Sequence, residues 1–199
     1  PVTRREFKVR AYQAFDIIFD DIFLFPLYHD VCAVIFLSIG LDESWEWPPF
    51  FGPITEAYTM RRYWSHFWQR TIYRSFGTHS SLFLRKVLRI ENQRTAFARI
   101  VNAFGVFGLS AIMHAMVSAK EGGQCAWGRS MLFWIYQPCA FMLEEAVQAV
   151  WGRLKRGFGV KESGLVKGLQ RVVGYCWVCA WLLWIAPTRT NSLVNCGIE

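Results

Sequence analysis

The sequence lacks the patterns that would place it in several common classes. Its 199 residues contain no internal repeat and no low-complexity tract, which argues against a repeat architecture. Since no pair of broken helices is visible either, a small channel or transporter is disfavoured. No small-residue cleavage site follows the polar, basic N-terminus, so no cleavable signal peptide is predicted. The chain begins without an initiator Met, and we therefore expect it to be processed or to be a fragment.

The sequence also lacks a convincing metal-binding pattern. Its six cysteines are scattered along the chain. Cys176 and Cys179 have the C-x-x-C spacing of redox and zinc sites, but no second pair and no nearby histidine accompany them. Because both lie in an apolar stretch, we interpret them as packing residues and expect no metal site.

Hydrophobic residues are abundant, and the charges are confined to blocks. The chain is 53% hydrophobic and 17% aromatic, with a mean hydropathy of +0.19, whereas soluble domains are about 45–50% apolar. The net charge of +7 comes from three basic blocks that flank apolar runs: Arg4–Arg10, Arg61–Arg99 and Arg153–Arg171. This is the positive-inside pattern of a membrane protein rather than a phosphate-reading groove. We therefore expect membrane lipid, and no nucleic acid, as a partner.

The hydropathy pattern predicts a single all-α membrane domain over residues 1–199, built as a multipass transmembrane helical bundle. Three runs are long and apolar enough to cross a bilayer: 97–119, 131–151 and 171–187. Residues 11–40 are apolar but contain acidic residues and a proline, which predicts kinked or interfacial helices. Residues 41–96 are expected to form a cytosolic or interfacial segment with an aromatic and basic helix, because prolines prevent a long helix before Thr55.

One histidine lies within the first of these runs. His114 belongs to Phe97–Ala119, whose only other ionisable residue is Arg99. An ionisable side chain at membrane depth is uncommon and usually faces a polar cavity. A neutral imidazole is also the best general base near neutral pH. The residues alone leave two interpretations open, a general base or a structural histidine bonded to a neighbouring helix.

Polar residues follow one face of each of the first two runs. Ser110 and Ser118 lie one turn before and one turn after His114. In the second run three polar residues share a face: Gln137, Glu144 and Gln148. Two adjacent polar stripes indicate a shared internal cavity. The alternative is polar contact between helices, together with serine hydroxyls that bond to their own helix.

A tract rich in Trp, Tyr and Arg precedes these runs. Residues 47–70 read WPPFFGPITEAYTMRRYWSHFWQR, followed in order by FGLSAIMHA at 107–115 and a Q-x-x-x-x-M-L-E-E-A-V-Q segment at 137–148. The three motifs resemble the wax-synthase-like branch of the membrane-bound O-acyltransferases, most of all the fungal members that acetylate hydroxyls of terpenoid and meroterpenoid metabolites. The resemblance covers about residues 45–187. It implies the helical bundle of that family, with this chain as the C-terminal part of a longer member or as a short member.

The resemblance implies an acyl-CoA-dependent O-acyltransferase that transfers an acetyl or another acyl group to a hydroxyl of a hydrophobic small molecule. Its partners would be the alcohol and the acyl-CoA, which is a co-substrate, and no bound cofactor is implied. We expect an integral, multi-pass protein of the endoplasmic reticulum. The alternative is a catalytically inactive or truncated membrane relative with a scaffold role, and a departure from the family pattern supports it.

That departure is Gln69, which stands where the family usually has His or Asn after the second Trp of its W-x-x-x-W tract. The resemblance implies His114 and Gln69 as the catalytic residues. An amide can donate a hydrogen bond to an oxyanion but cannot act as a base. His66, about one helical turn away, is a candidate to compensate. The candidates for substrate or CoA binding are Arg61, Arg62, Trp64, Trp68, Arg70, Ser110, Gln137 and Glu144, although positive-inside topology alone also explains the arginines.

Overall fold

The structure is a computed structural model that describes residues 3–92, 94–159 and 162–196. Within these ranges the side chains of residues 17, 18, 20, 70–74, 121–126, 129 and 190–196 are left out of the description. The described residues contain helices and no strand, which confirms the predicted all-α class. The elements are α1 (Arg4–Ser38), η1 (Ser44–Glu46), η2 (Ile54–Glu56), α2 (Met60–Arg62), the π-helix η3 (Tyr63–Phe67), α3 (Arg70–Lys86), α4 (Ala96–Ile135), α5 (Gln137–Gly157) and α6 (Gly164–Cys196).

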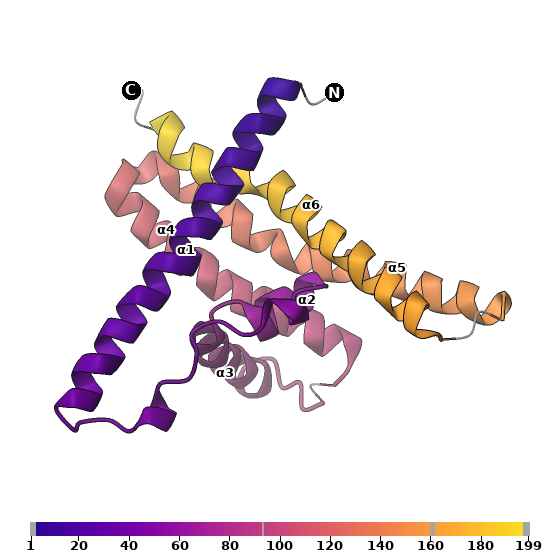
Figure 1. The fold of residues 1–199 in the computed structure, drawn as a ribbon, viewed down its shortest axis with the longest axis horizontal. Coiled ribbons are helices and arrows are strands. Elements are labelled where there is room, and N and C mark those ends of the chain that lie inside the picture. The colour runs from indigo at the N-terminus through magenta and orange to yellow at the C-terminus, as the bar shows by residue number, and fades with distance from the viewer. Residues whose placement is uncertain (1–2, 93, 160–161, 197–199) are drawn as a thin grey trace.

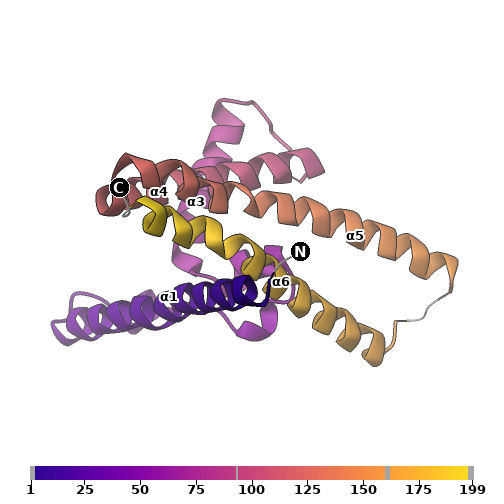
Figure 2. The same ribbon diagram turned by 90° about the horizontal axis from the view of Figure 1, so that it is seen from above.

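Helix α4 lies at the centre of the molecule. It packs against α3, α5 and α6, and α6 in turn packs against α1 (Figure 1). In the view from above, α1 crosses α6 (Figure 2). Helix α5 and the N-terminal half of α6 project from the same side of the body, and their chain directions are opposite (Figure 2). The site described below is built where α4 meets the segment from α2 to α3.

Helix α4 doubles back on itself. The Ser118 hydroxyl donates to the Ser130 hydroxyl at 3.1 Å, although a straight α-helix would separate the two positions by about 18 Å along its axis. Gly122 and Gly123 lie in the segment between them, and glycine is a frequent cause of sharp helix bends. The two arms of α4 therefore run side by side in opposite directions, and the second arm leads through Tyr136 into α5.

Three helices are long and apolar enough to cross a membrane within the described residues: Arg4–Ser38, Ala96–Lys120 and Gly164–Arg189. Two of them contain the predicted spans 97–119 and 171–187. The structure differs for 131–151, which is divided between the second arm of α4 and the more polar α5. Of the two alternatives for 11–40, a kinked span or two short helices, the structure has one continuous helix, α1, with Pro26 inside it.

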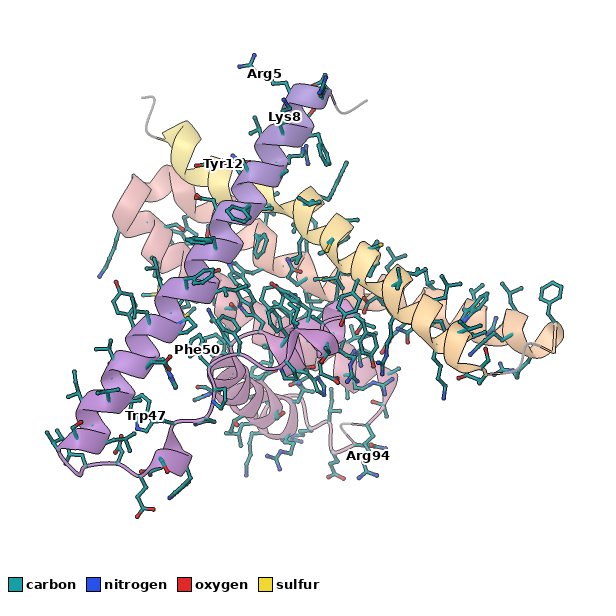
Figure 3. The ribbon with its side chains drawn as sticks, viewed as in Figure 1. Arg5, Lys8, Tyr12, Trp47, Phe50 and Arg94 are labelled. Carbon is teal, nitrogen blue, oxygen red and sulfur yellow. The ribbon has the colours of Figure 1, made fainter. Side chains whose placement is uncertain are left out.

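The middle part of the predicted cytosolic or interfacial segment 41–96 forms the core of the molecule. The buried side chains Tyr63, Trp64, Phe67 and Trp68 pack against α4, α5 and α6. Four aromatic rings within six residues remove a large apolar area from water. Figure 3 shows side chains crowded around this segment, with the labelled Trp47 and Phe50 in the loop that precedes it.

Candidate active site

The W-P-P-F-F-G loop supports the π-helix from outside. Gly52 donates its backbone N–H to the Phe67 carbonyl at 2.8 Å, and a Cβ at this glycine would collide with the His66 carbonyl. The Phe51 ring stacks on Phe67 at a centroid distance of 5.6 Å. The Phe50 ring contacts α1 through Phe25. The loop therefore holds the end of the π-helix in place between α1 and the core.

The π-helix ends at Phe67, two residues before Gln69, the residue that departs from the family pattern. The Trp68 N–H donates to the Tyr63 carbonyl at 2.7 Å, a bond that spans five residues, and π-turns of this kind are frequent at functional sites. Gln69 follows with φ 21° and ψ 70° and is the N-cap of α3, although its side chain makes no capping bond. A positive φ is uncommon for a residue other than glycine. This backbone leaves the Gln69 amide free to face the site instead of its own helix.

Helix α3 approaches α4 closely just beyond this point. The Ser80 hydroxyl donates to the Asn102 carbonyl at 3.1 Å, and a Cβ at Gly105 would collide with that hydroxyl. A glycine at the crossing lets the two backbones come near each other. The contact places the first turns of α3 beside the stretch of α4 that carries Ser110 and His114.

These elements line a small, half-open cavity, and both predicted catalytic residues are among its lining residues. Gln69 reaches it from the start of α3, and Ser110 and His114 reach it from the first arm of α4. The cavity measures about 50 Å³, room for a few water molecules at most. Its lining residues are Trp64, Trp68, Gln69, Phe76, Val106, Phe107, Ser110, Met113, His114 and Trp134.

The imidazole of His114 is stacked on an indole. The His114 and Trp134 rings lie 4.1 Å apart between centroids, with an interplanar angle of 11°. Trp134 belongs to the second arm of α4, so the doubling back of this helix creates the contact. Within the described part of the chain no hydrogen bond to the His114 ring nitrogens is present. A histidine held by its face keeps its nitrogen edge available to a reactant.

Gln137 lies elsewhere, in the contact between helices. It is fully buried, and its carbonyl oxygen accepts from the indole N–H groups of Trp64 and Trp181, each at 3.2 Å. Its amide nitrogen donates to the Phe133 carbonyl at 2.9 Å. With both ends of the amide used, Gln137 joins the π-helix, α5 and α6 as a polar contact and does not line the cavity.

Glu144, on α5, likewise makes a contact between elements, because its carboxylate packs against the start of α2. Its carboxylate accepts from the Met60 N–H at 2.6 Å and from the Arg61 N–H at 3.5 Å. Burial raises the pKa of Glu144, while the bonds from the two amides act in the opposite direction. A carboxylate that bonds the first N–H groups of a helix acts as a cap supplied from another helix.

The predicted arginines are engaged with carboxylates outside the cavity lining. Arg61 Nη2 lies 2.5 Å from Glu145 Oε1, and Arg62 pairs with Glu56. The Arg70 side chain lies outside the described residues.

His66 is exposed and contacts the Ser65 hydroxyl at 2.6 Å, so it is not at the cavity and cannot replace a missing histidine there.

Trp134 is the main residue of the site that the sequence interpretation missed. Phe107, which also lines the cavity, lies one helical turn before Ser110, so helical spacing from His114 could have identified it. No comparable signal marks Trp134, because its contact with His114 depends on the doubling back of α4. No group of three or more potential metal ligands gathers within the described ranges.

The residues of this site lie in a part of the chain that matches a known protein family. Residues 47–136, which include both Gln69 and His114, match the model of the membrane-bound O-acyl transferase family. The chain is 29% identical over 172 residues to the acetyltransferase spyB of Aspergillus fumigatus, covering 80% of this chain and 29% of that protein.

Two further relatives carry the same kind of name. The chain is 32% identical to the acetyltransferase ataH of Aspergillus terreus, covering 81% of this chain and 51% of that protein. It is 30% identical to the acetyltransferase nanB of Aspergillus nanangensis, covering 79% of this chain and 37% of that protein. The chain thus spans at most about half the length of these relatives. No solved structure matches it.

Proposed function

We propose that this chain, which belongs to the membrane-bound O-acyl transferase family, transfers an acetyl group from acetyl-CoA to a hydroxyl of a hydrophobic small molecule. The observation that carries the proposal is the shared cavity of Gln69 and His114. A base and an amide donor facing the same small space are what acyl transfer to an alcohol needs.

His114 is the general base in this mechanism. One ring nitrogen takes the proton from the substrate hydroxyl, and the oxygen attacks the carbonyl carbon of the thioester. The C–S bond of the tetrahedral intermediate then breaks, and the proton on His114 can pass to the departing sulfur. Because a thiol has a pKa of about 8.5, the CoA thiolate leaves with little help.

Gln69 is the donor to the oxyanion. The carbonyl oxygen of the thioester gains negative charge as the tetrahedral intermediate forms, and the Gln69 side-chain N–H₂ donates to it. The absence of a capping bond from this side chain is consistent with that use. Ser110, 7% exposed and also on the lining, offers a second hydroxyl for orienting the alcohol.

The lining also bears on the substrate. Apart from Gln69, Ser110 and His114 it consists of apolar and aromatic side chains, which suits an apolar acceptor such as a terpenoid or meroterpenoid alcohol. Pockets that hold small-molecule ligands usually measure about 300–1,000 Å³, whereas this one measures about 50 Å³. The cavity therefore has room for the reacting hydroxyl and thioester groups and not for a whole substrate.

Arg61 and Arg62 are the described candidates for the CoA phosphates. Guanidinium groups bind phosphate in a bidentate manner, and these two would exchange Glu145 and Glu56 for the incoming phosphates. Arg70 is a third candidate on sequence grounds. We place the protein in the endoplasmic reticulum membrane as a multi-pass protein, on the basis of its apolar helices and basic blocks.

The test is acetyl transfer by membranes that contain the protein, measured with labelled acetyl-CoA and a panel of hydroxylated terpenoids. We expect a labelled ester from the parent and none above background from His114→Ala. His79→Ala is the matched control, because His79 is exposed and, among the described residues, its ring bonds to the Ser75 carbonyl of its own helix alone. Equal transfer by the parent and His114→Ala would overturn the proposed mechanism. No transfer by the parent from any acyl-CoA would favour an inactive relative.

A further inference from the structure

An ion pair with a buried carboxylate and a part-exposed guanidinium lies next to the indole on which His114 stacks. Asp21 of α1 is 5% exposed, and its carboxylate accepts from Arg189 Nη1 of α6 at 3.0 Å. The Arg189 guanidinium carbon lies 5.9 Å from the centroid of the Trp134 ring. Two helices that contribute no residue to the cavity lining therefore converge on a ring that lines it.

Trp134 is held by its ring contacts. Its indole N–H is buried and makes no hydrogen bond within the described residues. The ring contacts Trp64 at 5.5 Å and Phe133 at 5.0 Å between centroids, in addition to His114 and Arg189. Since no hydrogen bond fixes this indole, the surrounding aromatic rings and the guanidinium determine where its plane lies.

The plane of Trp134 in turn determines the plane of His114. The two rings are nearly parallel at 4.1 Å, so rotation of the imidazole out of this plane would break the stack. A base must present one nitrogen edge to the hydroxyl within hydrogen-bond reach, and small errors in its position lower the rate steeply. His114 has no hydrogen bond within the described residues that could replace this constraint.

We propose that Trp134 is a positioning residue for His114, and that the Asp21–Arg189 pair secures Trp134 by holding the guanidinium against it. The proposal deepens the proposed function and rests on it. Trp134 does not touch the reacting atoms as a base or an acid. It keeps the imidazole edge directed into the cavity.

The first experiment compares Trp134→Phe and Trp134→Ala in the acetyl-transfer assay. Phenylalanine keeps an aromatic face for the stack, whereas alanine removes it. We expect kcat to fall about 10²-fold in Trp134→Ala, with the KM for acetyl-CoA nearly unchanged, and Trp134→Phe to recover most of the loss. Trp127→Ala, at an exposed tryptophan of the same helix, should match the parent. Equal losses in Trp134→Phe and Trp134→Ala, or none in either, would overturn the proposal.

A second measurement does not depend on catalysis. Diethyl pyrocarbonate modifies histidine ring nitrogens, and mass spectrometry of the peptide that contains His114 gives its rate of modification. We expect the rate to rise severalfold in Trp134→Ala and to stay near the parent value in Trp134→Phe and Trp127→Ala. If the parent transfers no acetyl group, the proposed function fails, and this rate alone decides whether Trp134 restrains His114. An unchanged rate in Trp134→Ala would show that it does not.

The ion pair is tested with Arg189→Lys. Lysine keeps the positive charge for Asp21 but lacks the planar guanidinium that lies against Trp134. We expect kcat and the His114 modification rate to lie between those of Trp134→Phe and Trp134→Ala. Parent values for both quantities would remove Arg189 and Asp21 from the proposal and leave Trp134 as the residue that acts on His114.

Discussion

Two groups of polar residues share the same aromatic core, and they differ in how their hydrogen bonds are used. The Gln137 amide bonds to both sides and the Glu144 carboxylate bonds to two backbone amides. Gln69 and His114 instead face a cavity, without a capping bond from Gln69 and without a described bond to the His114 ring nitrogens. Buried polar groups whose hydrogen-bond donors and acceptors are paired contribute to stability. Groups that keep an unpaired donor or acceptor are available for chemistry.

The comparison makes opposite predictions for the two groups. Substitutions at Gln69 or His114 should lower activity without lowering stability, because they remove no described hydrogen bond that holds the fold. Substitutions at Gln137 or Glu144 should lower stability. Activity should fall only in proportion to the loss of folded protein. Measurements of both quantities on the same variants can confirm or break this division.

The largest effect is expected for His114→Ala. Loss of a general base typically lowers the rate about 10²–10⁴-fold. The thermal unfolding midpoint of the purified protein should stay near the parent value, since the imidazole only stacks on Trp134. Turnover and differential scanning fluorimetry on one preparation check both expectations. A large drop in the unfolding midpoint would move His114 into the structural group.

Gln69 should show the next largest effect, and three variants distinguish its roles. Gln69→Leu removes the amide donor, which is worth about 10²–10³-fold in turnover. Gln69→Asn keeps the donor on a shorter arm and should retain part of the activity. An inactive relative would instead give no activity in the parent and a gain in Gln69→His. Four equal rates in the acetyl-transfer assay would exclude Gln69 from the site.

Gln137→Leu tests the structural group. The substitution leaves the buried indole N–H groups of Trp64 and Trp181 without their acceptor, and an unsatisfied buried donor costs about 1–3 kcal/mol. Gln148→Leu is the control, because Gln148 is exposed on the same helix. Denaturant unfolding in detergent should separate the two variants. Full stability with lost turnover in Gln137→Leu would assign this amide to catalysis.

The smallest effects are expected at two neighbouring glutamates. Glu144→Gln keeps an oxygen for one backbone amide of α2 but loses the charge, at a cost of about 1 kcal/mol. Glu145→Gln removes a part-exposed ion pair with Arg61, which contributes about 0–1 kcal/mol. Stability measurements should therefore rank Glu144→Gln below Glu145→Gln. The reverse order would mean that the cap on α2 contributes little.

Much of the site could be predicted from local sequence. His114 stood out because an ionisable residue in an apolar helix needs a polar surrounding, and Ser110 followed from helical spacing. Gln69 came from the family resemblance and not from any physical pattern. The same periodicity argument also predicted that Gln137 and Glu144 line a cavity. It could not show that Gln137 already accepts hydrogen bonds from two indoles and Glu144 from two backbone amides.

The sequence by itself determined the helical class, the apolar runs of the first arm of α4 and of α6, and the match of residues 47–136 to the membrane-bound O-acyl transferase family. These follow from composition, hydropathy and short motifs, which are properties of neighbouring residues. The tertiary structure decided that α4 doubles back, that the aromatic tract packs into the core, and that Trp134 lies on His114. Each of these depends on contacts between residues far apart in the chain, and a buried amide becomes a packing residue or a reactive one only through the partners that such contacts supply.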